Sequence, residues 1–104
     1  MIDISSFSRD QLKEKIIEQL QTVIDPHIGI DIWTLGFIYN IDVKEDNAVH
    51  ILMTLTTPMC PLESTLKQDI SDALAEIGIT TLTMQTTFDP PWQPPQKVRE
   101  MFAR

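Results

Sequence analysis

The chain of 104 residues has one cysteine, few basic residues and no long apolar run. One cysteine excludes an internal disulfide, and the first residues show no basic stretch followed by an apolar one, so we expect a protein of the reducing cytoplasm. Eight basic residues against fifteen acidic ones give a formal net charge of −7, which argues against binding to nucleic acid or to anionic membrane surfaces. Without about 18 consecutive apolar residues, no membrane-spanning helix is expected.

The patterns that are present predict one small α+β domain over residues 1–104. Ser8 and Gln11 have the spacing of a capping box, and apolar residues from Leu12 to Val23 follow at helical spacing until Pro26 stops the helix. The later elements follow in the order strand 37–44, strand 49–56, helix 61–78, strand 79–88, proline-rich arm 89–95 and short helix 97–104. The order α-β-β-α-β predicts helices packed on one face of a three-stranded sheet.

The stretch "DPHIGIDIWTLGFIYN", which begins at Asp25, is predicted to be a loop because it combines an Asp-Pro turn with two glycines. It is unusually apolar for a loop. We therefore expect it either to pack against the domain or to line a binding surface.

The segment "TTPMCPLE" places the cysteine, Cys60, between two prolines where a strand is expected to give way to a helix. Pro61 suits the first position of a helix, which predicts Cys60 as the N-cap. Unpaired N–H groups and the helix dipole stabilise a thiolate there and lower the pKa of a thiol, whereas Glu63 in the first turn acts against it. The position favours metal binding or nucleophilic chemistry. A cysteine that serves only as a small buried apolar side chain remains an alternative.

Several other residues are candidates to assist Cys60, each with a structural alternative. His27 shares several metals with a thiolate, but a loop histidine without a partner at ligand spacing is more often a surface residue. Asp25 could orient Cys60 or a bound iron, or it could cap the turn that its own proline makes. Thr34 and Thr57 are candidate hydroxyl donors whose alternative role is a bond to the backbone.

The position of two further residues in the predicted elements indicates their roles. Trp92 in the proline-rich arm is either a lid over the sheet or an anchor for a partner protein, and we take it as the candidate partner-binding residue. His50 lies on the polar side of its strand, so we expect it to make a cross-strand contact and exclude it from the site.

Three motifs resemble, in order and spacing, the small iron–sulfur cluster maturation domain of the SufT/PaaD-like family. They are "DPHIGIDIWTLGFIYNIDV", "MTLTTPMCPL" and "DPPWQPP", and the resemblance covers nearly the whole chain. The family's reactive cysteine matches Cys60, its Leu-Gly-Leu-Ile-Tyr-like segment matches residues 35–39, and its Pro-Pro-Trp arm ends at Trp92. Its Asp-Pro pair begins at Asp25, but the acidic residue that usually follows is replaced by His27.

The resemblance implies a stand-alone, non-enzymatic factor of the SUF-system type that helps iron–sulfur clusters reach apo-proteins, with Cys60 as a transient ligand. Because such clusters are generally held by four thiolates, one cysteine cannot hold a stable cluster alone. Either Cys60 from the two subunits of a homodimer bridges a labile cluster, completed by small thiols or His27, or the domain is an adaptor. An adaptor would dock scaffold or carrier proteins and apo-client proteins.

Three other interpretations stay open. Within the family, the protein could be dedicated to one multicomponent ring-oxidising oxygenase. Outside it, Cys60 with His27 as base would be a thiol-dependent enzyme, although the sequence places no third group to orient the pair. The domain could also be an interaction module in which Cys60 only packs.

Overall fold

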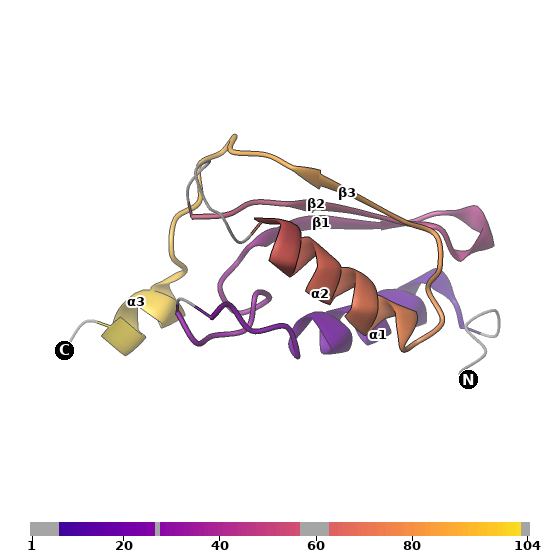
Figure 1. Ribbon diagram of the computed structural model, residues 1–104, viewed down its shortest axis with the longest axis horizontal. Helices are drawn as coiled ribbons and strands as arrows, with labels where there is room; N and C mark the ends of the chain where they lie inside the picture. The colour runs from indigo at the N-terminus through magenta and orange to yellow at the C-terminus, as the bar shows by residue number, and fades with distance from the viewer. Residues whose placement is uncertain (1–6, 27, 57–62, 103–104) are drawn as a thin grey trace.

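The structure is a computed structural model that describes residues 7–26, 28–56 and 63–102. Its helices are α1 (Arg9–Leu20), α2 (Glu63–Ala75) and α3 (Gln96–Phe102), and its strands are β1 (Ile38–Val43), β2 (Val49–Met53) and β3 (Leu82–Thr86). Helices α1 and α2 lie on the same face of the three-stranded sheet, and α3 lies at the end of the molecule to which β3 leads (Figure 1). The predicted α+β class, element order and layering are confirmed.

The sheet is mixed, with β2 in the centre. β1 pairs with β2 antiparallel through the short hairpin that joins them, and β3 pairs with β2 parallel, so that Ile51 faces both Ile41 and Met84. A parallel pair needs a crossover, which α2 supplies. On the outer face, His50 Nδ1 lies 2.7 Å from the Thr83 hydroxyl oxygen. The cross-strand contact expected for His50 is therefore confirmed.

Helix α1 begins with the predicted capping box. The Gln11 N–H donates to Ser8 Oγ at 3.2 Å, and the Ser8 N–H donates to Gln11 Oε1 at 3.0 Å. The helix ends at Leu20, earlier than the apolar spacing predicted. Beyond it the N–H groups of Thr22 and Val23 bond to carbonyls three residues back, and the Thr22 hydroxyl also donates to the Gln19 carbonyl at 2.6 Å. Val23 thus follows the helix, but its side chain is still buried in the core.

Helix α2 ends in a Schellman motif around Gly78. The Gly78 N–H bonds to the Ala75 carbonyl at 3.0 Å, and the Ile79 N–H bonds to the Leu74 carbonyl at 3.1 Å. Gly78 has φ +91, a conformation that glycine adopts without strain. Its predicted role as the C-terminal cap residue is confirmed.

All three strands are shorter than the alternation of apolar residues predicted. After Met53, pairing continues only through single bonds, in which the Thr54 N–H donates to the Phe37 carbonyl and the Thr87 N–H to the Met53 carbonyl, both at 2.8 Å. Leu55 is buried although it lies beyond the end of β2. The alternation of apolar residues therefore indicates which side chains are buried, not which residues pair in the sheet.

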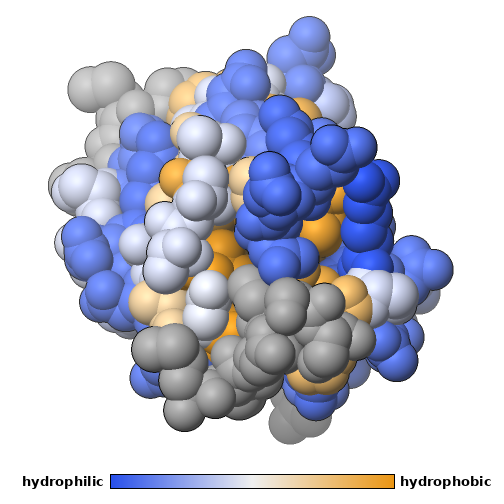
Figure 2. Space-filling view, turned by 90° about the vertical axis from the view of Figure 1, so that its right-hand side faces the viewer, coloured by the Kyte–Doolittle hydropathy of each residue, from blue (hydrophilic) through white to orange (hydrophobic). Residues whose placement is uncertain are grey.

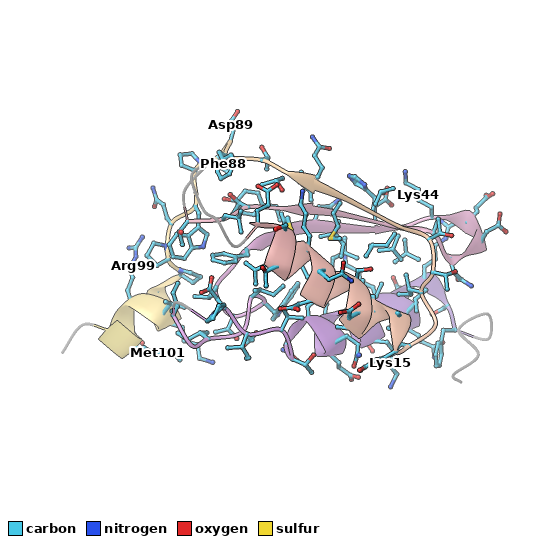
Figure 3. The ribbon with its side chains drawn as sticks, viewed as in Figure 1. Lys15, Lys44, Phe88, Asp89, Arg99 and Met101 are labelled. Carbon is cyan, nitrogen blue, oxygen red and sulfur yellow. The ribbon has the colours of Figure 1, made fainter. Side chains whose placement is uncertain are left out.

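Lys44 marks the end with the β1–β2 hairpin, and Phe88 and Asp89 mark the opposite end (Figure 3). The hairpin end face is mostly hydrophilic, with hydrophobic residues showing in patches between the polar ones (Figure 2). No helix among the described residues is long and apolar enough to cross a membrane.

Candidate functional site

The residues around the cysteine are described only on either side of it. Cys60, Thr57 and the predicted helix start at Pro61 lie outside the described residues, and so does His27. The described flanks are Thr56, which follows β2 and is exposed, and the start of α2. The chain segment that carries Cys60 therefore joins the end of β2 to the beginning of α2.

The first turn of α2 carries an ion pair next to this segment. Lys67 Nζ lies 3.2 Å from Glu63 Oε1, and both side chains are partly exposed. The pair is at i,i+4 spacing with the acid first, the more favourable orientation. The negative charge of Glu63, which acts against a thiolate at this helix end, is thus offset by a neighbouring ammonium group.

Asp25 is buried and organises the loop that follows α1. Its Oδ1 accepts a bond from the Ile28 N–H at 3.2 Å, and its carbonyl accepts one from the Gly29 N–H at 2.7 Å. Its own N–H bonds to the Ile30 carbonyl at 3.0 Å. The side chain therefore has the turn-capping role that we weighed against a role in orienting Cys60 or iron, and the second role stays a prediction.

The apolar loop is packed against the domain, which is one of its two predicted fates. Ile32 and Leu35 are fully buried, and Trp33 is half-buried against the core. The N–H of Thr34 donates to Asp31 Oδ2 at 2.9 Å, so this residue is held through its backbone in a second aspartate-capped turn.

Trp92 is tied to the end of this loop by two contacts. Its indole Nε1 donates to the Leu35 carbonyl at 2.7 Å, and its ring meets Phe37 edge-on with centroids 5.4 Å apart. The arm therefore covers part of the molecule as a lid. Trp92 remains partly exposed, and its partner-binding role stays a prediction.

Two more contacts attach the arm to residues 35–39. The Tyr39 hydroxyl donates to the Pro90 carbonyl at 2.9 Å. At Gly36, which has φ +76, a Cβ would lie 3.2 Å from Cγ of Pro95. The segment and the arm, which the sequence resemblance singled out as separate motifs, thus form one packed unit. We did not expect Tyr39 to anchor the arm, and no pattern in the sequence indicates such a long-range bond.

A buried hydroxyl that has no hydrogen-bond partner among the described residues lies at the end of β3. Thr86 Oγ1 is the buried side-chain oxygen or nitrogen that makes no hydrogen bond in the described part of the chain. The more buried residues of this strand are Leu82, Met84 and Thr86. The alternation of apolar residues in this threonine-rich strand could therefore have identified Thr86 as a buried threonine. It lies opposite Met53, the last residue of β2 before the segment that leads to Cys60.

The described residues alone do not assemble a metal centre. Within residues 7–26, 28–56 and 63–102, no three His, Cys, Asp or Glu side chains come together to hold an ion. The predicted ligands Cys60 and His27 both lie outside these ranges.

The chain was compared with known proteins. A family model described as "Iron-sulfur cluster assembly protein" matches residues 13–81. The Fe-S protein maturation auxiliary factor YitW of Bacillus subtilis is 38% identical over 84 residues, which cover 80% of this chain and 82% of that protein. The Fe-S protein maturation auxiliary factor SufT of Staphylococcus aureus is 37% identical over 83 residues, covering 79% and 89%.

Among solved structures, a domain of unknown function from Bacillus anthracis superposes with a TM-score of 0.82 at 25% identity and covers 90% of this chain and 93% of that one. The arrangement of two helices on a mixed sheet is therefore shared over nearly the whole length of both chains. Together with the family match, which spans well over half of the sequence, this confirms the resemblance inferred from the three motifs. The chain belongs to the iron–sulfur cluster assembly protein family.

Proposed function

We propose that the protein is a maturation factor that helps iron–sulfur clusters pass from scaffold or carrier proteins to apo-proteins in the cytoplasm, without catalysing a reaction of its own. The observation that carries this proposal is the family match, because residues 13–81 include most of α1, strands β1 and β2, α2 and the segment with Cys60. The names of the two bacterial relatives, both maturation auxiliary factors, support the same role.

In this role Cys60 is a transient ligand of the cluster, which is cargo. Its thiolate replaces one scaffold thiolate on an iron atom, and a thiolate of the apo-protein later replaces Cys60. Each exchange keeps the number of ligands and the oxidation state of the iron, and the proton that leaves the Cys60 thiol passes to the released thiolate. A single thiol suits such a step because it cannot retain a cluster that needs about four ligands.

Contacts within the segments that resemble the family's motifs support a rigid frame for this exchange. Asp25 closes the loop after α1, and Trp92 and Tyr39 hold the proline-rich arm against residues 35–39. The pair of Glu63 with Lys67 reduces the negative charge at the start of α2. A fixed frame lowers the conformational entropy lost when a cluster or a partner binds.

The test is complementation of a deletion strain under iron limitation. We would measure aconitase activity, which depends on an iron–sulfur cluster, after expressing the wild type, Cys60→Ser or Ser64→Ala at matched levels. Ser64 is exposed in the first turn of α2, so its variant controls for a substitution near the same helix end. We expect the wild type and Ser64→Ala to restore activity and Cys60→Ser to fail.

The other outcomes separate the remaining interpretations. Full restoration by Cys60→Ser would make the protein an adaptor with a structural thiol. No loss of aconitase activity on deletion would contradict a general role and leave a factor restricted to one client, such as a ring-oxidising oxygenase. Turnover of a thioester or persulfide by the purified protein without iron would instead identify a thiol enzyme.

A further inference from the structure

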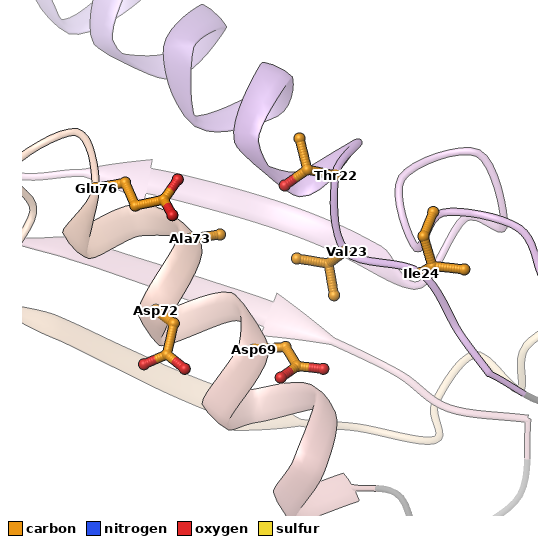
Figure 4. A pocket seen from close by; sticks show the side chains of 7 residues that line it. All are labelled: Thr22, Val23, Ile24, Asp69, Asp72, Ala73 and Glu76. Carbon is orange, nitrogen blue, oxygen red and sulfur yellow. The ribbon is translucent and has the colours of Figure 1, made fainter.

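A groove lies between the end of α1 and the second half of α2 (Figure 4). Its volume is about 270 Å³. Val23 and Ala73 point toward each other across it and are buried, so they form an apolar floor. Ile24 at its edge is 48% exposed, one of the two large apolar side chains left open to solvent in the described part of the chain.

Three carboxylates line the α2 side of this groove. Asp69, Asp72 and Glu76 are spaced three and four residues apart and therefore share one face of the helix. None of them forms an ion pair within the described residues, where their hydrogen bonds come from the neutral amides of Gln68 and Gln19. The negative charge of this face is thus not compensated inside the described part of the molecule.

This placement of charge works against the stability of the helix. Acidic residues three or four positions apart repel each other, and near a helix C-terminus they also face the negative end of the helix dipole. α2 ends at Ala75, next to Glu76 and within one turn of Asp72. Uncompensated negative charge around a groove with an apolar floor complements a partner segment that carries positive charge.

We propose that this groove docks a partner protein of the cluster-transfer machinery through a segment in which an apolar side chain is flanked by lysines or arginines. At about 270 Å³ the groove is smaller than most small-molecule sites, which span roughly 300–1,000 Å³, and suits one or two side chains. A second copy of this chain would bring a further formal charge of −7 and is disfavoured by repulsion. The proposal rests on the proposed function for the identity of the partner class.

The test uses the full-length ¹⁵N-labelled protein and a synthetic amphipathic peptide of leucine and lysine, titrated by NMR. We expect shifts concentrated at the amides of Ile24, Asp69 and Ala73, and binding that weakens several-fold between about 0.05 M and about 0.5 M salt. The same peptide with glutamate in place of lysine should not bind. Shifts scattered over the whole surface, or no localised shift at about 1 mM peptide, would overturn the proposal.

Two variants with the same change in net charge separate docking from general attraction. The groove variant carries Asp69→Asn, Asp72→Asn and Glu76→Gln, and the hairpin variant carries Asp42→Asn, Glu45→Gln and Asp46→Asn at exposed positions near the β1–β2 hairpin. We expect the groove variant to bind the peptide at least tenfold more weakly than the wild type and to melt at the same or a higher temperature. The hairpin variant should bind the peptide as tightly as the wild type does. If both variants bind the peptide equally more weakly, net charge rather than the groove determines binding, and the proposal is overturned.

Two further measurements distinguish this proposal from its neighbours. Cys60→Ser should bind the peptide as tightly as the wild type, so a failure of the proposed ligand role leaves the docking result intact. A wild type that sediments as a dimer and a groove variant that sediments as a monomer would identify a second copy as the occupant, and that result would overturn the proposal.

Discussion

Replacing Trp92 with phenylalanine tests whether the proline-rich arm is held by the contacts that the structure shows. The change removes the bond from the indole Nε1 to the Leu35 carbonyl, 2.7 Å long, and keeps most of the edge-on contact with Phe37. A lost bond costs about 0.5–1.5 kcal/mol, and more when a buried acceptor is left unpaired. Because Leu35 is fully buried, we expect a loss of about 1–2 kcal/mol in the free energy of unfolding.

Trp92→Ala should cost more because it also removes the aromatic pair, which contributes about 0.5–1.5 kcal/mol. Since Trp92 is only half-buried, the total should stay below the roughly 3–5 kcal/mol measured for fully buried aromatic residues. For a domain of this size each kcal/mol lowers the melting temperature by about 4–8 °C. Trp92→Phe should therefore melt visibly earlier than the wild type, and Trp92→Ala earlier still.

The assay is urea unfolding followed by far-ultraviolet circular dichroism, because replacing one of two tryptophans changes the fluorescence itself. Trp33→Phe is the matched control, since Trp33 packs against the core but its indole makes no hydrogen bond in the described part of the chain. If Trp92→Phe and Trp33→Phe lose equally little stability, the indole bond does not hold the arm and the reasoning is wrong.

Two smaller predictions address the backbone and a buried hydroxyl near the site. Gly36→Ala and Gly29→Ala both put a side chain at positive φ, at a cost of about 1–2 kcal/mol. Thermal melts should show the larger loss of stability for Gly36→Ala, because the new Cβ would press on Pro95, whereas Gly29 faces open space among the described residues. Thr86→Val removes the unpartnered hydroxyl at nearly constant volume and should raise the free energy of unfolding by up to about 1 kcal/mol; a loss of stability in urea would show that the hydroxyl has a partner.

Local sequence patterns predicted the parts of the fold that local interactions determine. The capping box of Ser8 and Gln11 and the left-handed glycine at Gly78 each act within one turn of a helix, so spacing alone identifies them. The alternation of a buried set that includes Val49 and Ile51 with a second set that includes His50 and Leu52 predicted a strand with one buried face for the same reason.

Contacts between distant segments could not be predicted in this way. The bonds from Tyr39 to Pro90 and from Trp92 to Leu35 join residues 51 and 57 positions apart and use backbone carbonyls as acceptors. Any residue offers such a carbonyl, so no side-chain pattern marks the place where the arm docks. The sequence did not predict the groove between α1 and α2 for a related reason. Its carboxylates have the spacing of an ordinary solvent-exposed helix face, and only the fold places the end of α1 beside them.

The position of the groove on α2 decides how docking and cluster transfer can be combined. Asp69 and Asp72, which line the groove, lie six and nine residues beyond Glu63, which at 1.5 Å per residue is about 9 Å and about 14 Å along the helix axis. A segment bound at the groove would therefore leave free the start of α2, where the segment with Cys60 joins. One helix would then hold a partner near its end, while the chain segment that carries Cys60 joins its beginning, so we expect affinity and transfer to depend on different residues. Loss of the carboxylates should weaken docking with the thiol intact, and loss of the thiol should stop transfer with docking intact.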